Sequence, residues 1–249
     1  MRIGGFMLDI HCHICYGCDD GAEDLETAVE MIRTARKSGT AGIAATPHCN
    51  VPGSFQNRWN DDMNAKILNL RNELKKRNID IKIYAGQEIF CTDEALELLK
   101  SDNLITLNFS RYPLVEFGFY EKAESVYEKL KRLAAEGYVP VVAHPERYAF
   151  VSEDENAAVS LKNTGSLLQL NKGSLEGRFG KEAFEAAHGI VERGLADVVA
   201  SDAHSPYMRT PDMSAAHEII CENYSYDYAR LLLDINPARI LNNRETLTL

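Results

Sequence analysis

The sequence lacks a long apolar run and an excess of positive charge. None of its apolar segments approaches the roughly 20 residues that a membrane-spanning helix needs, and residues 1–6 lack the apolar stretch of a secretory signal. The formal net charge of −10 argues against nonspecific binding to nucleic acid or to anionic membranes. These absences predict a cytoplasmic protein with no nucleic-acid partner and no membrane insertion.

Common nucleophile motifs are also missing. The sequence has no Gly-x-Ser-x-Gly elbow and no Gly-x4-Gly-Lys-Ser/Thr phosphate loop. None of its six cysteines is followed six positions later by an arginine, the spacing that thiol-dependent tyrosine phosphatases use. Any phosphate-ester hydrolysis by this chain would therefore depend on bound metal ions.

Three of the six cysteines have the spacing Cys12-x2-Cys15-x2-Cys18, which also occurs in iron–sulfur and zinc sites. The distal cysteine pair that would complete a zinc site is missing. We interpret the cysteines as reduced thiols, as expected in a reducing compartment.

Apolar strand-like runs alternate with amphipathic helical runs almost throughout the chain. This alternation indicates a parallel sheet, and polar residues at nearly every strand end favour a closed or nearly closed α/β barrel. No linker or repeat divides the sequence, so we expect a single domain over residues 1–249, with residues 1–6 as a short N-terminal extension. The expected strands are 7–11, 41–46, 81–86, 113–117, 139–143, 167–170 and 196–201. The expected helices are 23–37, 57–77, 93–100, 121–136, 153–163, 181–193, 213–223, 226–233 and 237–242.

Nine potential metal donors lie in or just after these strands. They are His11, His13, Asp20, His48, Glu88, Glu116, His144, Asp202 and His204. All nine offer nitrogen or oxygen atoms, and imidazole suits manganese, iron or zinc better than magnesium. Nine donors are too many for one ion, whereas two or three ions that share a carboxylate would use them all. The sequence therefore predicts a centre of two to three divalent transition-metal ions.

The motifs around these donors carry a family resemblance. They occupy residues 9–14, 19–21, 45–48, 85–89, 143–148, 169–174 and 201–204. Together they resemble the PHP (polymerase and histidinol phosphatase) superfamily. Within it, they are most similar to the bacterial manganese-dependent protein-tyrosine phosphatases of capsule and exopolysaccharide loci. The resemblance spans about residues 7–242 and implies a distorted (β/α)7 TIM-like barrel of the PHP type.

The resemblance also implies how the donors divide among three ions, with manganese preferred and iron or zinc possible. His11, His13, Glu88 and Asp202 would hold the first ion. Glu88 would bridge to a second ion, which Glu116 and His144 would also hold. Asp20, His48 and His204 would hold the third.

We expect Arg147 and Arg209 to hold the phosphate, because a guanidinium group matches phosphate oxygens. The expected activity is hydrolysis of phosphotyrosine on a bacterial tyrosine kinase, or on its peptide tail, in the regulation of capsule or exopolysaccharide synthesis. Two alternatives stay open. One is a phosphatase for a small ester such as histidinol phosphate or a sugar phosphate, and the other is a non-catalytic, metal-stabilised interaction module. The sequence leaves the oligomeric state open.

Overall fold

The computed structural model describes residues 7–248, so the predicted extension at residues 1–6 lies outside the described residues. Strands and helices alternate along most of this range, and every strand pair is parallel. The prediction of an α/β fold with parallel strands is therefore confirmed. The strands are β1 (Met7–Cys12), β2 (Thr40–Ala45), β3 (His48–Cys49), β4 (Lys82–Ala85), β5 (Glu88–Phe90), β6 (Leu114–Glu116), β7 (Val141–Ala143), β8 (Leu167–Asn171) and β9 (Val198–Ala200).

The strands form two sheets, with the orders β1-β2-β4 and β3-β5-β6-β7-β8-β9. Two short strands were not predicted: β3 and β5 follow the expected strands 41–46 and 81–86, because pairing stops at residues 46–47 and again at 86–87. Pro47 has no amide hydrogen to donate to a ladder. Gly86 is closely packed, since a Cβ there would lie 3.1 Å from Thr46 Cγ2. The chain therefore steps from the first sheet to the second at both places.

The two sheets also meet at β1 and β9, through side-chain contacts and one isolated bridge. Cys12 pairs with Ala203 in this bridge. The Asp9 carboxylate accepts a hydrogen bond of 3.0 Å from the backbone N–H of Ser201, and the N–H of Asp202 donates to the carbonyl oxygen of His11 at 2.8 Å. Strand pairing among residues 7–248 thus gives two connected sheets rather than one continuous closed barrel.

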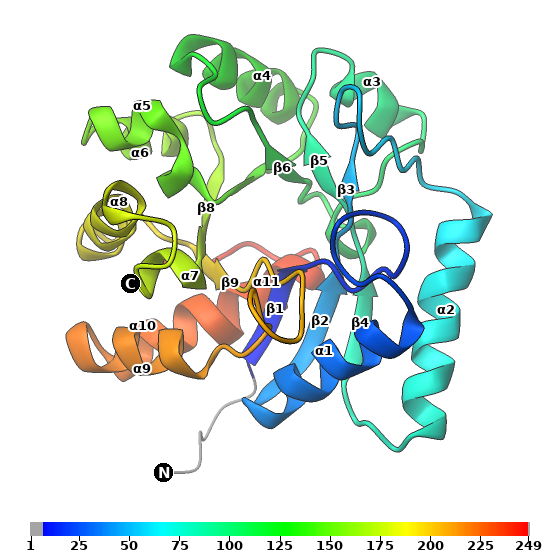
Figure 1. The fold of residues 1–249 in the computed structure, drawn as a ribbon. Helices are drawn as coiled ribbons and strands as arrows, with labels where there is room; N and C mark the ends of the chain where they lie inside the picture. The colour runs from blue at the N-terminus through cyan, green and yellow to red at the C-terminus, as the bar shows by residue number, and fades with distance from the viewer. Residues whose placement is uncertain (1–6, 249) are drawn as a thin grey trace.

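Helices lie around the outside of the strands (Figure 1). The α-helices are α1 (Leu25–Lys37), α2 (Asp61–Lys76), α3 (Ala95–Lys100), α4 (Ala123–Ala135), α5 (Ala149–Glu153), α6 (Ala157–Lys162), α7 (Lys172–Leu175), α8 (Lys181–Glu192), α9 (Ser214–Asn223), α10 (Tyr226–Arg230) and α11 (Asn236–Leu241). Short turns of other helical types are η1 (Leu107–Phe109), η2 (Pro145–Arg147) and η3 (Leu231–Ile235). No helix within residues 7–248 is both long and apolar enough to cross a membrane.

Three helix predictions need correction. The helix expected from residue 57 begins at Asp61, because the Asn60 side chain caps it by accepting a hydrogen bond from the N–H of Met63. The helix expected over 153–163 is wrong, since α5 ends at Glu153 and α6 begins at Ala157. The expected helix over 226–233 likewise ends as α10 at Arg230 and continues as the wider turn η3.

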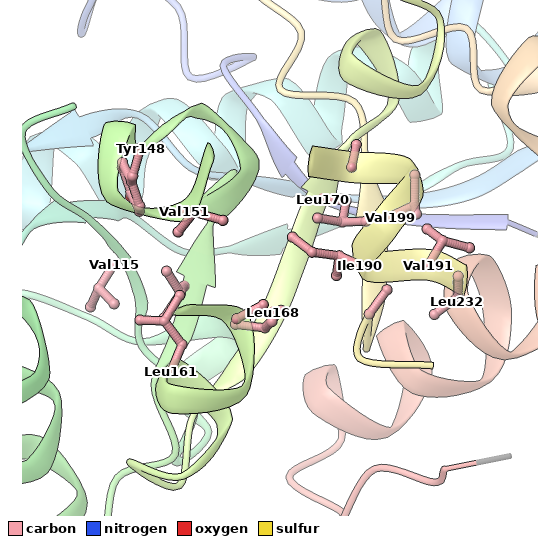
Figure 2. Packing of buried hydrophobic residues seen from close by; sticks show 14 of the residues in the cluster. Val115, Tyr148, Val151, Leu161, Leu168, Leu170, Ile190, Val191, Val199 and Leu232 are labelled. Carbon is pink, nitrogen blue, oxygen red and sulfur yellow. The ribbon is translucent and has the colours of Figure 1, made fainter. Parts of the chain in front are cut away.

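Strand β8 shows how the fold separates its core from its polar interior. Leu168 and Leu170 belong to the apolar cluster that β8 shares with the surrounding helices (Figure 2). Gln169 and Asn171 alternate with them and are fully buried on the opposite side, where both contact candidate metal donors. The period of two along β8 therefore places Leu168 and Leu170 on the outer face and Gln169 and Asn171 on the inner face, near the donors.

Candidate metal centre

The structure brings all nine predicted donors together at one end of the strands. His11 lies in β1, and His48 and Glu88 follow the ends of β2 and β4, where they begin β3 and β5. Glu116 ends β6, and His144 directly follows β7. His13 and Asp20 lie in the loop after β1, and Asp202 and His204 lie just beyond β9. The carboxyl ends of parallel strands meet at one edge, which explains how residues so distant in sequence converge.

The first group of donors is fully enclosed. It contains His11, His13, Glu88 and Asp202, and all four side chains are buried. Glu88 Oε2 lies 3.1 Å from His11 Nε2 and 3.3 Å from His13 Nε2. Asp202 Oδ1 lies 3.5 and 3.4 Å from the same two nitrogens. Four donor atoms therefore surround one point, as a metal site requires.

The second group surrounds the other side of Glu88. His48 Nδ1 lies 2.9 Å from Glu88 Oε2 and 3.0 Å from Glu116 Oε1. His144 Nε2 lies 2.9 Å from Glu88 Oε1 and 3.9 Å from Glu116 Oε2. Both oxygens of Glu88 thus face histidines, and its carboxylate lies between the first two groups.

The third group is the most exposed. Asp20 Oδ1 lies 3.7 Å from His48 Nε2 and 3.5 Å from His204 Nε2. The side chain of Asp20 is 58% exposed, whereas that of His204 is 6% exposed. His13 also belongs to this group, and its ring centre lies 3.7 Å from that of His204. Solvent therefore reaches the donor set at Asp20.

The hydrogen bonds of the imidazoles show that the donor set fits metal ions. His13 Nδ1 lies 2.7 Å from Asp19 Oδ2, and His11 Nδ1 lies 2.8 Å from Gln169 Oε1. Both partners are acceptors, so each Nδ1 carries a proton and each Nε2 is left to bind either a second proton or a metal ion. These two Nε2 atoms face each other at 3.3 Å. Two such nitrogens beside two carboxylates are suited to hold a cation between them.

His204 follows the same pattern. Its Nδ1 lies 3.0 Å from the carbonyl oxygen of Asp202, which can only accept. Its buried Nε2 makes no hydrogen bond within residues 7–248 and faces Asp20. Ligating histidines usually donate their second ring N–H in this way.

The histidines and carboxylates of the site shift one another's pKa values. Burial acts to raise the pKa of Glu88, but the charges of protonated His11 and His48 outweigh burial and hold that pKa well below its usual range. Burial acts to lower the pKa of His48, yet the nearby carboxylates of Glu88 and Glu116 raise it to about 10. The carboxylates therefore draw positive charge into the site, which protons or metal ions can supply.

Backbone strain marks two of the donors. His144 has φ 37° and ψ 52°, and Asp202 has φ 49°. These left-handed conformations are unfavourable for residues with a side chain and tend to occur at functional positions. Both residues follow a strand end, where the turn aims their side chains back over the sheet.

The sequence analysis missed three residues that support the donors: Asp19, Gln169 and Asn171. Asp19 Oδ2 also accepts a hydrogen bond of 2.8 Å from the N–H of His48, so it holds two parts of the site. Asn171 Nδ2 donates to Asp202 Oδ2 at 2.6 Å. All three lie in the motifs at 19–21 and 169–174, which were the available signal.

The two predicted phosphate-binding arginines converge on Asp202. Arg209 Nη2 lies 2.6 Å and Arg147 Nη1 3.6 Å from Asp202 Oδ2. Both guanidinium groups also face Phe179, which the sequence analysis did not identify. Two guanidinium groups therefore lie beside the first donor group, and both contact the ring of Phe179.

An apolar cavity of about 250 Å³ opens next to the donors. His48 and Glu116 form its polar end, and its other lining residues are Val51, Phe55, Phe90, Phe117, Gly118 and Phe119. The ring of Phe55 stacks on that of His48 at 5.9 Å with an interplanar angle of 8°. The cavity can accept a flat apolar group attached to a charged group at the donors.

The match of the sequence to a protein-family model agrees with this geometry. The model is described as capsular polysaccharide synthesis, CpsB/CapC, and it matches residues 7–242. The chain belongs to the CpsB/CapC family. The match covers the whole donor set, from His11 to His204. The family resemblance recognised in the sequence motifs is therefore confirmed.

Similar proteins come from several bacteria. The chain is 33% identical over 242 residues to the tyrosine-protein phosphatase YwqE of Bacillus subtilis, with 96% of this chain and 92% of that protein covered. It is 32% identical over 240 residues to the tyrosine-protein phosphatase CpsB of Streptococcus pneumoniae, with 94% and 98% covered.

A solved structure resembles the whole fold. It superposes with a TM-score of 0.90 at 32% identity and covers 98% of this chain and 97% of its own. It comes from crystal structures of YwqE from Bacillus subtilis and CpsB from Streptococcus pneumoniae, described as unique metal-dependent tyrosine phosphatases.

Proposed function

We propose that this protein is a metal-dependent protein-tyrosine phosphatase that acts in capsule or exopolysaccharide synthesis. The observation that carries the proposal is the convergence of nine nitrogen and oxygen donors, with imidazole nitrogens close to buried carboxylates. Membership in the CpsB/CapC family and the tyrosine-phosphatase relatives support the same activity.

Two to three divalent ions, manganese foremost, would occupy the donor groups. His11, His13, Glu88 and Asp202 would hold one ion. Glu88 would share a second ion with Glu116 and His144, and Asp20, His48 and His204 would hold a third. When bound, such ions activate water and offset the charge of a phosphate ester. In this chain, Asp19 and Gln169 fix the imidazoles so that their Nε2 atoms point inward.

Arg147 and Arg209 would hold the phosphate of the substrate. Their guanidinium groups lie beside Asp202, where they can exchange a carboxylate partner for phosphate oxygens without leaving the site. The partial exposure of both side chains, 21% and 35%, leaves room for that exchange. Phe179 supports both cations through contact with its ring.

The apolar cavity beside His48 favours an aryl ester over a small polar one. A phosphotyrosine ring would lie among Phe55, Phe90 and Phe119, with its phosphate directed at the donors. A sugar phosphate or histidinol phosphate would leave these aromatic surfaces unfilled. The exposed rings of Phe119 and Tyr120 at the rim can contact a peptide on either side of the tyrosine. We infer that the substrate is a phosphotyrosine segment, such as the tail of a bacterial tyrosine kinase.

The same family relation supports a distorted (β/α)7 barrel of the PHP type. The two sheets would together act as its wall, with β2 continued by β3 and β4 continued by β5. The breaks at residues 46–47 and 86–87 would be the distortion.

Hydrolysis of defined substrates tests the function. Manganese-loaded protein is assayed against a phosphotyrosine peptide, the matched phosphoserine peptide, histidinol phosphate and a panel of sugar phosphates. We expect the highest kcat/KM on the phosphotyrosine peptide and loss of that activity in EDTA. A higher kcat/KM on histidinol phosphate or on a sugar phosphate would replace the proposal with the small-ester alternative. No activity on any ester, with full metal occupancy, would favour the interaction module.

A further inference from the structure

The loop after β1 holds two thiols in contact. Cys18 Sγ lies 3.3 Å from Cys15 Sγ, and both cysteines are free. A disulfide needs about 2.05 Å between its sulfurs, so the two atoms would have to approach by only about 1.3 Å. Cys12 does not join them, because its Sγ faces the carbonyl oxygen of Ala203 at 3.9 Å. No candidate metal-binding group within residues 7–248 includes a cysteine.

The two thiols differ in access. Cys15 is buried, whereas Cys18 is partly exposed and reachable by a small oxidant. Lys66 of α2 lies close by, with its Nζ 3.7 Å from Cys18 Sγ and 3.3 Å from the carbonyl oxygen of Gly17. Cys18 is therefore placed to react first, with Cys15 as its resolving partner.

The same loop carries two carboxylates of the metal centre. Asp19 and Asp20 directly follow Cys18 in the sequence. Asn57 Nδ2 donates to the carbonyl oxygens of Cys18 and His48, each at 2.7 Å. The backbone at Cys18 is thus tied both to the carboxylate loop and to the strand that begins with His48. A shift of Cys18 would therefore move the adjacent Asp19 and Asp20, and Asp20 belongs to the third donor group.

We propose that Cys15 and Cys18 form a reversible regulatory disulfide whose formation displaces Asp19 and Asp20 and weakens metal binding at the third donor group. The effect on phosphatase activity rests on the proposed function, whereas the disulfide and its effect on metal binding do not. Labile disulfides of this kind occur in reducing compartments as regulatory devices.

The chemistry balances with a peroxide as the oxidant. The Cys18 sulfur attacks one oxygen of hydrogen peroxide, the O–O bond breaks, and a sulfenic acid and water form. The Cys15 sulfur then attacks the sulfenic sulfur, the S–O bond breaks, and a second water leaves. Two thiols lose two electrons and two protons in total, and one peroxide becomes two waters. A thiol reductant reverses the bond by exchange.

Peptide mapping tests the site itself. The reduced, metal-free full-length protein is treated with hydrogen peroxide, freed of oxidant, digested and analysed by mass spectrometry. We expect the peptide that contains residues 15 and 18 to lose the mass of two hydrogens and to regain it in dithiothreitol. Peroxide-treated protein that keeps both thiols, or that carries only irreversible sulfinic or sulfonic acids at Cys18, would overturn the proposal.

Manganese binding tests the coupling independently of catalysis. Oxidised and reduced proteins are titrated with manganese, and bound metal and thermal stability are measured. A displacement of about 1 Å at a catalytic site can cost about a hundredfold, so we expect at least a roughly tenfold weaker affinity in the weakest class of sites after oxidation. The activity on an aryl phosphate at limiting manganese should fall in parallel. Unchanged metal affinity in protein with a mapped Cys15–Cys18 disulfide would refute the coupling.

Matched variants test whether this disulfide, and not oxidation of another residue, lowers the manganese affinity. Cys18→Ser and Cys15→Ala should keep the parental manganese affinity in both the untreated and the peroxide-treated protein. Cys221→Ser is the control, because Cys221 lies in α9 outside the site and the variant should respond to peroxide as the parent does. A peroxide response that survives Cys18→Ser would assign the effect to another residue and overturn the proposal.

Discussion

Arg147 lies across the face of Phe179, with its guanidinium carbon 4.6 Å from the centre of the ring. The same ring faces Arg209 at 5.8 Å, so one aromatic side chain contacts both cations that border Asp202. Phe179 itself packs on Gly173, where a Cβ would lie 2.6 Å from Phe179 Cε2. The segment between α7 and α8 therefore contacts two arginines, one at the end of η2 and one in the loop after β9.

This arrangement predicts a shared role for the arginines in phosphate binding. Loss of a charged hydrogen bond costs about 1.5–3 kcal/mol, which corresponds to roughly tenfold to more than a hundredfold in rate. Arg147→Ala and Arg209→Ala should each lower kcat/KM for a phosphotyrosine peptide by about that factor, with manganese content unchanged. Arg→Lys at either position should restore only part of the loss, because ammonium cannot make the bidentate contact. Parental kcat/KM in both alanine variants would exclude these residues from phosphate binding.

Removal of metal should affect stability as well as activity. The carboxylates of Glu88, Asp202 and Glu116 are buried close together, and without cations they depend on protonated histidines. We expect elemental analysis to find two to three transition-metal ions per chain. Dialysis against EDTA should abolish hydrolysis and lower the Tm, and added manganese should restore both. Full activity with fewer than one ion per chain would contradict a metal mechanism.

Glu88 should matter more than Asp20. Glu88 belongs to two donor groups and is fully buried, whereas Asp20 belongs to one and is largely exposed. Glu88→Gln should therefore cost more kcat at saturating manganese than Asp20→Asn, and it should lower the number of bound ions further. Equal losses, or a larger loss in Asp20→Asn, would count against a bridging Glu88.

Asp19 should act through His13 rather than through direct contact with substrate. Outer hydrogen-bond partners of ligating histidines are typically worth about 10–100-fold in metal affinity. Asp19→Asn should weaken manganese binding by about that factor, with a smaller change in kcat once manganese is saturating. Asp93→Asn is a suitable control, because the Asp93 side chain is 84% exposed and lies outside the site. A loss of kcat that saturating manganese does not correct would indicate a direct catalytic role instead.

The apolar cavity makes a prediction about specificity. Phe55→Ala removes one ring from the cavity wall while leaving the donors in place. We expect KM for a phosphotyrosine peptide to rise several-fold, since one aromatic contact is worth about 0.5–1.5 kcal/mol beyond its buried area. KM for a small alkyl phosphate should stay near the parental value. Equal changes for both substrates would show that the ring supports the site generally and does not bind the aryl group.

Sequence periodicity was sufficient to predict seven of the nine strands and the donors near their ends. The apolar runs before His11, Glu116 and His144 have the length and composition of buried strands, and donors that follow such runs meet at one edge. The short strands β3 and β5, beyond the second and third expected strands, could not be predicted in this way. Pro47 and Gly86 lie at the ends of the apolar runs, and the sequence alone does not tell that pairing resumes after them with other neighbours.

The supporting residues were harder to predict, for a different physical reason. Asp19 and Asp20 are adjacent carboxylates in a tightly turned loop, where no periodicity tells which one faces inward. The structure shows that Asp19 is buried against His13 and that Asp20 faces solvent and His204. Phe179 likewise lies in an irregular segment, so its place behind the arginines depends on tertiary packing alone.

The division into two sheets has a consequence for the unfolding of the protein. His11 belongs to the three-stranded sheet, whereas His48, Glu88 and Glu116 belong to the six-stranded sheet. Ions held among them would cross-link two sheets that share few backbone pairs. We therefore expect the metal-bound protein to unfold in one cooperative step. Without metal, amide hydrogen exchange should show that one sheet exchanges earlier than the other.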